Sequence, residues 1–472
     1  MARGKKQSLS AEELVEQALV PEEEQPYEVP GNWVWVKFGH LAIDIADGPF
    51  GSNLKKEHYT DSKEVRIIQL SNIGENGWRE DNTKYTTYEH AETISRSLVK
   101  PGEIVIAKMM PAGRAIIVPN GEKAYVLSSD AIKFVPKKSM NTKYMLYAIN
   151  SNMFRNQITL ETQGITRART SIGKIKTYAF PLPPLTEQQR IVDRIESLFA
   201  KLDQVKELAQ NALDSFETRK AAILHKAFTG ELTAKWREEH GVGMDSWETI
   251  PLSKLAFIQT GLAKGKQFNS DMTTMPYLRV ANVQDGYLDL SEIKLITVEK
   301  NKIERYLLKE GDVLFTEGGD YDKLGRGTVW RAEIDNCLHQ NHVFAVRPES
   351  TVLNPFYLAY LASSRYGKAY FLSCSKQTTN LASINSTQLK AFPVLCPNIS
   401  EQQEIVSVID VLIEKEQSAK NKLEHLLNQI DVMKKSILFS AFRGELGTND
   451  QSEESALELL KEVILSTLME HK

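Results

Sequence analysis

The feature that most constrains this chain is a helix-like segment of 45 residues that occurs twice. The first copy runs from Thr186 to Gly230 and the second from Ser400 to Gly444, so that equivalent residues lie 214 positions apart. Apolar residues within both copies recur at alternating spacings of four and three, which is the heptad pattern of helices that pack along each other. The sequence therefore predicts two long helices that pack along each other.

Both segments also carry residues typical of helix ends. Thr186 with Gln189, and Ser400 with Gln403, fit the capping box, in which a hydroxyl and a side-chain amide satisfy free backbone N–H groups. A glycine closes each segment, where a left-handed residue is favoured. We expect one continuous helix in each segment, a rod of roughly 60 Å.

Two charged residues, Arg219 and Glu416, interrupt the apolar seam. Antiparallel helices related by a twofold axis pair positions whose numbers have a constant sum. If that sum is 635, Arg219 faces Glu416, and the pair fixes the register at little net gain in stability. A shift of one heptad would put Ile409 opposite Arg219 instead. We predict the first register.

The regions before the two helices resemble each other as well. Matching pairs are 68–73 with 278–283, 99–105 with 308–314, Gly113-Arg114 with Gly325-Arg326, Asn141 with Asn354, Ser171-Ile172 with Ser383-Ile384, and 179–181 with 391–393. Runs typical of strands lie at Val65–Leu70, Glu103–Ala107, Ala115–Val118 and Ile132–Val135, and Asn141 is placed to cap a helix over Thr142–Asn150. The loops between them differ: 48–55 stands against 260–267, and 109–113 against 317–325. Two like scaffolds that carry unlike loops indicate two modules that read different things.

These patterns divide the chain into six parts and predict an α+β fold with a pseudo-twofold internal repeat. The parts are a leader with a short helix (1–30), module 1 (31–182), the first helical spacer (183–246), module 2 (247–397), the second helical spacer (398–446) and a tail with a short helix (447–472). The leader helix, over Ala11–Leu19, is expected to be frayed or to dock on the long helices or a partner.

Charge is distributed unevenly although the net charge is only −3. Residues 31–180 carry +7 and residues 247–397 carry +2, whereas residues 1–30 carry −4 and residues 398–472 carry −6. The absence of a signal peptide and of a long apolar run favours a soluble cytoplasmic protein without a membrane span. The three cysteines, with no CxxC pair, argue against a disulfide framework or a zinc ribbon.

No set of catalytic or metal-ligating residues stands out. The chain lacks a Gly-rich phosphate loop and a nucleotide-binding turn. Asn354-Pro-Phe-Tyr357 is closer to a helix start than to a methyltransferase motif, and His339 and His342 have no neighbouring carboxylate or Cys in sequence at a ligand spacing. Asp320 and Asp322 are typical of a solvent-exposed loop. We therefore expect no catalytic residue, no metal and no cofactor in this chain.

The doubled helical motifs resemble those of the specificity subunit of type I restriction–modification enzymes. The residues that carry the likeness are 181–192 and 397–406 around Glu-Gln-Gln, 227–233 and 441–446 around Gly-Glu-Leu, the loop 48–52, and the strand 339–348. The likeness covers residues 31 to about 446.

This resemblance implies a non-catalytic subunit that binds double-stranded DNA. Each module would read one half of a bipartite, asymmetric target in the major groove. The two long helices would form an antiparallel coiled coil that sets the gap between the halves. Two modification subunits would carry S-adenosylmethionine and methylate adenine at N6, and two restriction subunits would use ATP and Mg²⁺. The alternatives are a self-sufficient DNA methyltransferase or nuclease, and a coiled-coil adaptor that does not read DNA.

The candidate DNA-binding residues are polar or basic side chains in the loops of both modules. Arginine can pair with guanine or phosphate through two hydrogen bonds, and the short loops 166–170 and 378–382 precede the helical spacers, which would hold them rigidly. The predicted residues are Lys55, Arg114, Arg167 and Arg169 in module 1, and Lys264, Lys266, Gln267, Lys323, Arg326, Gln377 and Asn380 in module 2.

Overall fold

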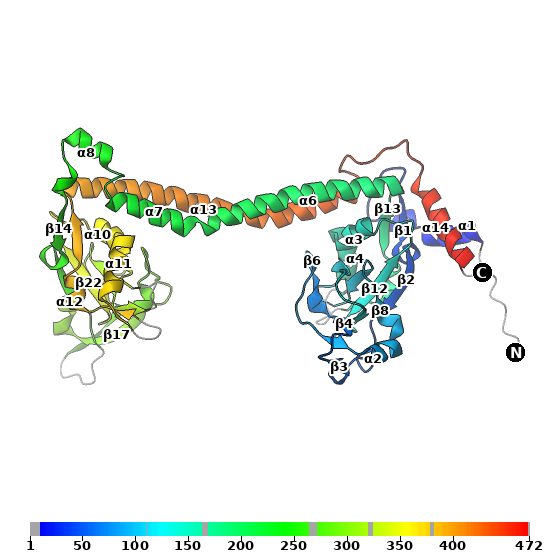
Figure 1. Ribbon diagram of the computed structural model, residues 1–472, viewed down its shortest axis with the longest axis horizontal. Coiled ribbons are helices and arrows are strands. Elements are labelled where there is room, and N and C mark those ends of the chain that lie inside the picture. Colours follow the sequence, from blue (N-terminus) through cyan, green and yellow to red (C-terminus); the bar gives the residue numbers. More distant parts are fainter. Residues whose placement is uncertain are drawn as a thin grey trace. The chain divides into compact units, whose positions relative to one another are not determined.

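The computed structural model describes residues 10–109, 111–162, 169–263, 271–319, 324–377 and 382–470, which form two compact units (Figure 1). Unit 1 comprises residues 1–208 and 426–472, and unit 2 comprises residues 209–425. Each unit contains one of the two repeated modules together with part of the long helices. None of the described helices is long and apolar enough to cross a membrane.

Unit 1 is built on two sheets and a pair of helices. The first sheet has the order β10-β9-β12-β2 and the second the order β3-β7-β4-β11-β8. Its strands are β1 (Val34–Lys37), β2 (Ala42–Asp47), β3 (Tyr59–Thr60), β4 (Val65–Ile68), β5 (Ile73–Gly74), β6 (Gly77–Trp78), β7 (Tyr85–Thr86), β8 (Leu98–Val99), β9 (Ile104–Ala107), β10 (Ala115–Ile117), β11 (Tyr125–Leu127), β12 (Ala131–Pro136) and β13 (Ala179–Leu182). Its helices are α1 (Ala11–Ala18), α2 (Tyr88–Thr93), α3 (Thr142–Asn150), α4 (Asn152–Thr162), α5 (Ile172–Ile175) and α14 (Ala456–Glu470), with most of α6 (Leu185–Asp214).

Unit 2 repeats this plan. Its four-stranded sheet has the order β15-β22-β18-β20, and a smaller sheet has the order β17-β16-β21. The strands are β14 (Glu248–Pro251), β15 (Ala256–Thr260), β16 (Met272–Leu278), β17 (Lys294–Glu299), β18 (Val313–Thr316), β19 (Gly318–Gly319), β20 (Gly327–Val329), β21 (Leu338–His339), β22 (Val343–Pro348), β23 (Lys376–Gln377), β24 (Ala382–Ser383) and β25 (Pro393–Cys396). The helices are α7 (Phe216–Phe228), α8 (Ala234–His240), α9 (Ile303–Tyr306), α10 (Pro355–Ser363), α11 (Arg365–Cys374), α12 (Ser386–Lys390) and the first part of α13 (Ile399–Ala441).

The strands and helix caps that were predicted from short stretches of sequence are confirmed. Each strand predicted from the sequence is present with ends that differ by two residues at most, and so is the α+β class. Asn141 accepts hydrogen bonds from the backbone N–H groups of Lys143 and Tyr144 at the start of α3, and Asn354 caps α10 in the same way, with Pro355 in the first turn. The largest core of each unit includes the buried faces of the four-stranded sheet and of the capped helix, whereas β4 belongs to smaller clusters in the second sheet of unit 1.

The alignment of the two modules near their last strand is corrected by the structure. Lys37 and Pro251 each lie four residues after equivalent tryptophans, Trp33 and Trp247. Lys37 pairs with Ala179 and Pro251 pairs with Pro393, so Ala179 is equivalent to Pro393 and not to Ala391. Likewise, Ser171 is the N-cap of α5 and Asn385 the N-cap of α12. The two Ala-Phe-Pro sequences are therefore offset by two residues when the units are aligned by structure. Backbone pairing, and not sequence identity, determines which residues are equivalent.

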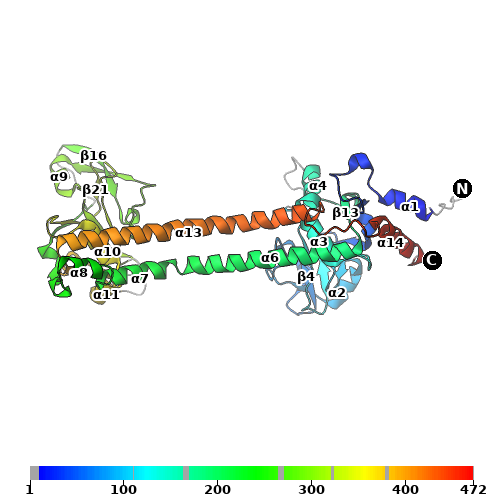
Figure 2. The same ribbon diagram turned by 90° about the horizontal axis from the view of Figure 1, so that it is seen from above.

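The two long helical segments run side by side, α13 against α6 in unit 1 and against α7 in unit 2 (Figure 2). In unit 2, Arg219 Nε donates to Glu416 Oε2 at 2.8 Å, and Lys420 Nζ lies 4.9 Å from the centre of the Phe216 ring. In unit 1, Lys434 Nζ lies 2.5 Å from Asp203 Oδ1. These contacts join residues whose numbers have nearly the same sum, which is the signature of antiparallel helices.

The first segment is not one continuous helix, contrary to the prediction. It is divided at Ser215 into α6 and α7, whereas α13 runs unbroken for 43 residues. Ser215 Oγ and Arg219 Nη1 both donate to the carbonyl oxygen of Ala212, each at 3.0 Å. Side chains that compete for a helix carbonyl in this way interrupt the backbone ladder.

The predicted capping boxes are also wrong, because both helices begin two residues earlier than caps at Thr186 and Ser400 require. Thr186 lies inside α6 and donates its hydroxyl to Glu453 Oε1 at 2.7 Å. At the second helix, Asn398 Oδ1 accepts from the backbone N–H of Glu401 at 2.9 Å, so Asn398 and not Ser400 is the cap.

The doubled Glu-Gln-Gln motif instead attaches each module to its long helix. In unit 1, the buried Glu187 carboxylate accepts from Trp33 Nε1 at 2.7 Å, and Gln188 Oε1 accepts from the backbone N–H of Asn141 at 3.0 Å. The equivalent contacts in unit 2 are Trp247 Nε1 to Glu401 at 3.1 Å and the Asn354 N–H to Gln402 at 2.9 Å. The motif therefore fixes the position of the modules on the helices.

The two ends of the chain pack together in unit 1. Apolar residues of α1 and α14 share its core, and the backbone N–H of Ala456 donates to the Asn32 carbonyl at 2.9 Å. Tyr27 donates its hydroxyl to the carbonyl of Phe442 at 2.9 Å. The leader helix thus docks on the tail helix, a partner that the sequence alone did not identify.

Candidate nucleic-acid interface

The two four-stranded sheets end in equivalent backbone arrangements. Ala107 at the end of β9 pairs with Ala131, and Thr316 at the end of β18 pairs with Val343. One residue further along, the N–H of Lys108 donates to the Asp130 carbonyl at 2.8 Å, and the N–H of Glu317 donates to the His342 carbonyl at 2.9 Å. Position 108 is therefore equivalent to 317, and position 130 to 342.

A second segment crosses each of these strand ends. The N–H of Thr170 donates to the Lys108 carbonyl at 3.1 Å, and the N–H of Ile384 donates to the Glu317 carbonyl at 2.8 Å. The residue that follows each, Ser171 or Asn385, caps a short helix. The backbone that follows the predicted loops 166–170 and 378–382 is thus fixed on the sheet, although most of those loop residues lie outside the described residues.

A glycine allows a third segment to leave the sheet at the same end. A Cβ atom on Gly48 would lie 1.7 Å from the carbonyl oxygen of Ser128, and one on Gly261 would lie 2.2 Å from that of His339. Side chains are excluded at both positions by the close approach of the backbones. Three segments that differ in sequence between the units therefore start or end where the strands of the four-stranded sheet end. We call this region of each unit the strand-end site.

The side chains of the strand-end site differ between the units. In unit 1, Lys108 Nζ lies 2.6 Å from Asp47 Oδ1, and Arg169 forms an ion pair with Asp130. In unit 2, His342 Nδ1 contacts Glu317 Oε2 instead. These pairings could not be predicted from the sequence, because each joins residues that are far apart along the chain.

Four of the predicted DNA-binding residues have described side chains. Arg169 belongs to the strand-end site, and Lys55 is exposed, with its Nζ atom 3.6 Å from Glu57 Oε1. Arg114 Nε donates to the Pro111 carbonyl at 3.1 Å, and Arg326 Nη1 donates to Gln284 Oε1 at 2.8 Å. Only the backbone of Gln377 is described, in β23, and Arg167, Lys264, Lys266, Gln267, Lys323 and Asn380 lie outside the described residues.

Arg114 and Arg326 occupy equivalent positions, as the sequence suggested. Each follows a glycine with positive φ, +82° at Gly113 and +69° at Gly325. Partial burial is the main cause of a lowered pKa for the Arg114 guanidinium, which still remains charged at neutral pH. Both residues are held by neighbouring acceptors at the start of a strand, and this fixed placement is suited to a directed contact.

The register pair predicted in the helices lies away from the strand-end site. The hydrogen-bonded Arg219 and Glu416 side chains are 37% and 25% exposed, and they contact each other between α7 and α13. Their contact belongs to the helix pair and not to a DNA-facing loop.

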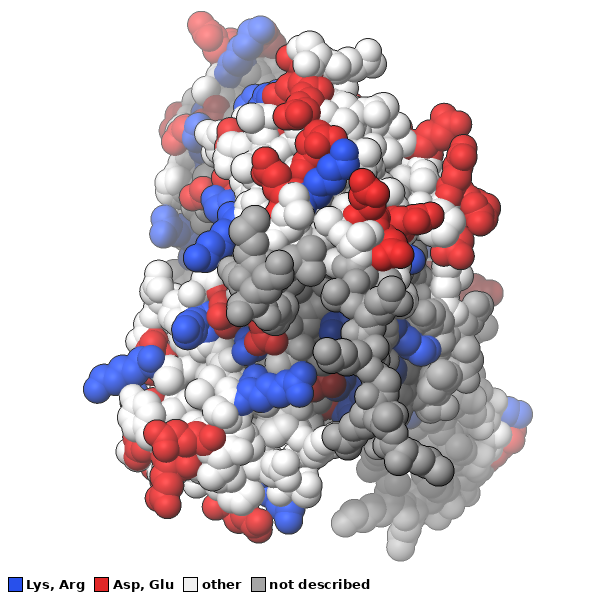
Figure 3. All heavy atoms as spheres, turned by 90° about the vertical axis from the view of Figure 1, so that its right-hand side faces the viewer, with Lys and Arg blue, Asp and Glu red and all other residues white. Residues whose placement is uncertain are grey.

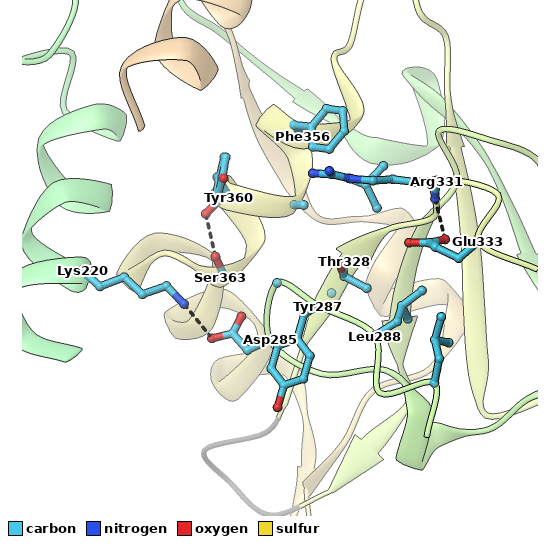
Figure 4. Close-up of a pocket in the computed structure, with 15 residues that line it drawn as sticks. Lys220, Asp285, Tyr287, Leu288, Thr328, Arg331, Glu333, Phe356, Tyr360 and Ser363 are labelled. Carbon is cyan, nitrogen blue, oxygen red and sulfur yellow. Dashed lines mark hydrogen bonds and ion pairs between the residues drawn. The ribbon is translucent and has the colours of Figure 1, made fainter. Parts of the chain in front are cut away.

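A cavity of about 400 Å³ lies in unit 2 between α7, α10 and the turn after Asp285 (Figure 4). Its charged side chains already have partners: Lys220 Nζ lies 3.9 Å from Asp285 Oδ2, and the Arg331 guanidinium stacks 5.0 Å from the Phe356 ring centre. Glu333 accepts from the backbone N–H of Arg331 at 2.9 Å. The cavity therefore presents little free charge for a ligand.

The part of the chain that the structure describes contains no group of three His, Cys, Asp or Glu side chains that could hold a metal ion. His339 is buried, and its Nδ1 atom lies 2.8 Å from the Val343 carbonyl oxygen. Burial lowers the pKa of His339 to about 4, so this side chain is neutral at pH 7. His339 is a core residue.

Acidic side chains gather over the upper part of the face shown in Figure 3, which is on the side of the N and C labels of Figure 1. The leader and the tail together carry a negative charge, as their sequences require. Phosphate groups would be repelled there, so the acidic region is a poorer candidate for DNA contact than the strand-end site.

Comparisons with known proteins agree with this organisation. The family described as "Type I restriction modification DNA specificity domain" matches residues 44–212 and 244–428. The EcoKI specificity subunit of Escherichia coli strain K12 is 26% identical over 449 residues, with 90% of this chain and 91% of that protein covered. The StySPI specificity subunit of Salmonella potsdam is 25% identical, with 85% and 88% covered.

Two solved structures share the fold. The HsdS subunit from Thermoanaerobacter tengcongensis has a TM-score of 0.59 and 19% identity, covering 89% of this chain and 99% of that one. A chain from a study of the assembly and conformational transition of the type I R-M system has a TM-score of 0.60 and 20% identity, covering 89% and 100%. On the extent of the sequence match, this chain belongs to the family of type I restriction–modification DNA specificity proteins.

Proposed function

We propose that this chain is the DNA-reading subunit of a type I restriction–modification enzyme and is not catalytic by itself. The observation that carries the proposal is the pair of equivalent strand-end sites, in which like scaffolds hold unlike side chains. Such an arrangement suits one protein that reads two different half-sites, because the scaffold is shared while the contacting residues vary.

In this proposal, the strand-end site of each unit enters the major groove, and lysines and arginines around it contact phosphates. Phosphate contacts place the protein on the duplex, and base contacts give the sequence preference. Among the described residues, Lys55 is suited to a phosphate contact, and Arg114, Arg169 and Arg326 are suited to base contacts. Arg167, Lys264, Lys266, Gln267, Lys323, Gln377 and Asn380 remain predicted contacts of the same kind.

The helix pair supports two further parts of the proposal. It sets the separation between the two half-sites, and its outer surface binds two modification subunits and two restriction subunits in the cytoplasm. The modification subunits supply S-adenosylmethionine for adenine-N6 methylation, and the restriction subunits use ATP and Mg²⁺. The Arg219–Glu416 contact supports a fixed register, which a spacer of defined length needs.

An exchange of one module tests this function. Residues 31–182 are replaced by the equivalent region of another family member, and the DNA sequences bound by the complex with its modification subunits are determined by selection from a random duplex library. We expect one half-site to change and the other to be retained. A change in both half-sites, or no selection of sequence by the unaltered chain, would contradict modular reading.

The affinity for DNA should also fall steeply as salt is raised. Each phosphate contact releases a counterion, so the logarithm of affinity declines linearly with the logarithm of salt concentration. Gel-shift titrations between about 50 and 200 mM salt measure the slope. Binding that does not respond to salt would oppose a role in DNA reading.

A further inference from the structure

The same position of the scaffold carries opposite charges in the two units. Lys108 follows β9 and Glu317 follows β18, and the matching backbone hydrogen bonds establish that they are equivalent. Residues that differ in charge at equivalent positions of the two modules are candidates for determining which base each module prefers.

In unit 1, the charge at this position is neutralised. The Lys108 side chain is only 11% exposed, and its ammonium group lies 2.6 Å from the Asp47 carboxylate. The neighbouring carboxylate, Asp130, is occupied by Arg169. Of these four charged side chains, Arg169 is the most exposed, at 49%, followed by Asp47 at 43%.

In unit 2, the carboxylate of Glu317 remains available. It is 35% exposed, and at the position equivalent to Asp47 the chain has the neutral Thr260. A carboxylate has about four acceptor sites, and the contact with His342 occupies one of them. Glu317 can therefore accept a further hydrogen bond from the solvent side.

His342 fixes the orientation of this carboxylate. Its Nε2 atom lies 3.2 Å from Asn341 Nδ2, which can only donate. On the other side of the ring, Nδ1–H donates to Glu317 Oε2, because a carboxylate can only accept. These contacts link Asn341, His342 and Glu317 in a row, and the contact with His342 engages only one of the two carboxylate oxygens of Glu317.

A carboxylate at a DNA interface is repelled by phosphates unless a base donates a hydrogen bond to it. In the major groove, the donors are the amino groups of cytosine and adenine. The adenine amino group has acceptors on both sides, N7 of the same base and O4 of thymine, whereas the cytosine amino group has an acceptor on one side only. A carboxylate therefore meets less repulsion at cytosine.

We propose that Glu317 is a specificity-determining residue with which unit 2 reads a cytosine through its N4 amino group, and that His342 is the positioning residue that holds it. This inference rests on the proposed function as a DNA reader. It names the class of base for one position of one half-site, which the family resemblance does not specify.

The test uses the full chain in its complex with the modification subunits, and sequences are selected from a random duplex library. For the unaltered chain we expect one position of one half-site to require cytosine. The variant Glu317→Gln should shift the preference there from cytosine toward adenine, because a side-chain amide can pair with adenine N6 and N7. Discrimination at that position should change by about tenfold or more, and all other positions should keep their preference.

The matched control is Glu349→Gln, which removes an exposed carboxylate just beyond the opposite end of β22. This variant should retain every base preference. If Glu317→Gln leaves all preferences unchanged, or weakens binding equally for all sequences, the inference is wrong while the proposed function stands. If the unaltered chain selects no sequence, the proposed function itself fails.

The role of His342 is tested by two variants. His342→Gln keeps an N–H donor for Glu317 and should preserve the preference for cytosine over adenine, measured with two duplexes that differ at the one position. His342→Leu removes the donor and should reduce that preference by about fivefold or more, with unchanged affinity for non-specific DNA. Equal effects of the two variants would overturn the positioning role.

Discussion

At the scale of single residues, equivalent positions show how one scaffold tolerates different chemistry. Leu127 pairs with Ile68 in unit 1, and His339 pairs with Leu278 at the corresponding place in unit 2. Both side chains are fully or almost fully buried. The histidine is tolerated because the Val343 carbonyl satisfies its Nδ1 atom and because burial keeps it neutral.

The lowered pKa of His339 makes the stability of unit 2 depend on pH. The folded-state pKa is about 4 and the ordinary value is 6.5, so between these values the unfolded chain binds a proton that the folded chain does not. Stability is therefore fully retained above pH 6.5 and is lost as pH falls toward 4, by about 3 kcal/mol in total. His339→Leu, which adopts the residue of unit 1, should remove this part of the pH dependence.

Denaturant titrations at several pH values between 4.5 and 7.5 measure this effect. The difference in unfolding free energy between the unaltered chain and His339→Leu should grow in favour of the variant as pH falls. If the difference in unfolding free energy does not vary with pH, His339 is not buried in its neutral form in the folded chain.

At the scale of elements, the helix pair is held in register by few polar contacts. Replacing Arg219 alone by Leu leaves the Glu416 carboxylate unpaired beside the apolar seam and removes a donor from the Ala212 carbonyl. We expect each single change, Arg219→Leu or Glu416→Leu, to cost about 1–2 kcal/mol. The double change should restore most of that loss, because apolar residues of similar size often replace such a pair without cost.

Urea unfolding followed by circular dichroism gives the coupling between the two positions. Asp203→Asn in unit 1 is the control, because the exposed Asp203 carboxylate pairs with Lys434 at the helix surface; its change should stay within about 0.5 kcal/mol. Single changes at Arg219 and Glu416 that simply add in the double variant would show that the pair does not act as a unit.

Sequence alone predicted those elements whose signals are local. Asn141 and Asn354 could be recognised as caps because a cap bonds to residues two or three positions away. The contact of Arg219 with Glu416 was predicted, but the break at Ser215 was not, since it depends on the Ser215 and Arg219 side chains both reaching the Ala212 carbonyl in the folded helix. The pairings at the strand-end site were missed for the same reason: Lys108 meets Asp47, and Glu317 meets His342, only after the sheet has formed.

At the scale of the whole molecule, one unit depends on both ends of the chain. The core of unit 1 contains residues of the first module together with Phe442, Ala456 and Leu460 from the end of the chain. Unit 2 comprises one uninterrupted stretch, residues 209–425. The two units should therefore respond separately to changes in their own cores.

Leu460→Ala, at a fully buried position of α14, should lower the stability of unit 1 by about 2–4 kcal/mol because it leaves a cavity. Leu358→Ala, at an equally buried position of α10, should do the same to unit 2. Differential scanning calorimetry should show that each variant shifts a different transition. A single transition shifted alike by both variants would mean that the units unfold together.

The division of unit 1 between the two ends of the chain also determines the order in which a nascent polypeptide can mature. Unit 2 has all of its residues once position 425 has left the ribosome, whereas unit 1 must wait for α14. Domains usually mature from the N-terminus onward during synthesis. Here the unit whose module is translated first is completed last, because α14 contributes Ala456 and Leu460 to its core.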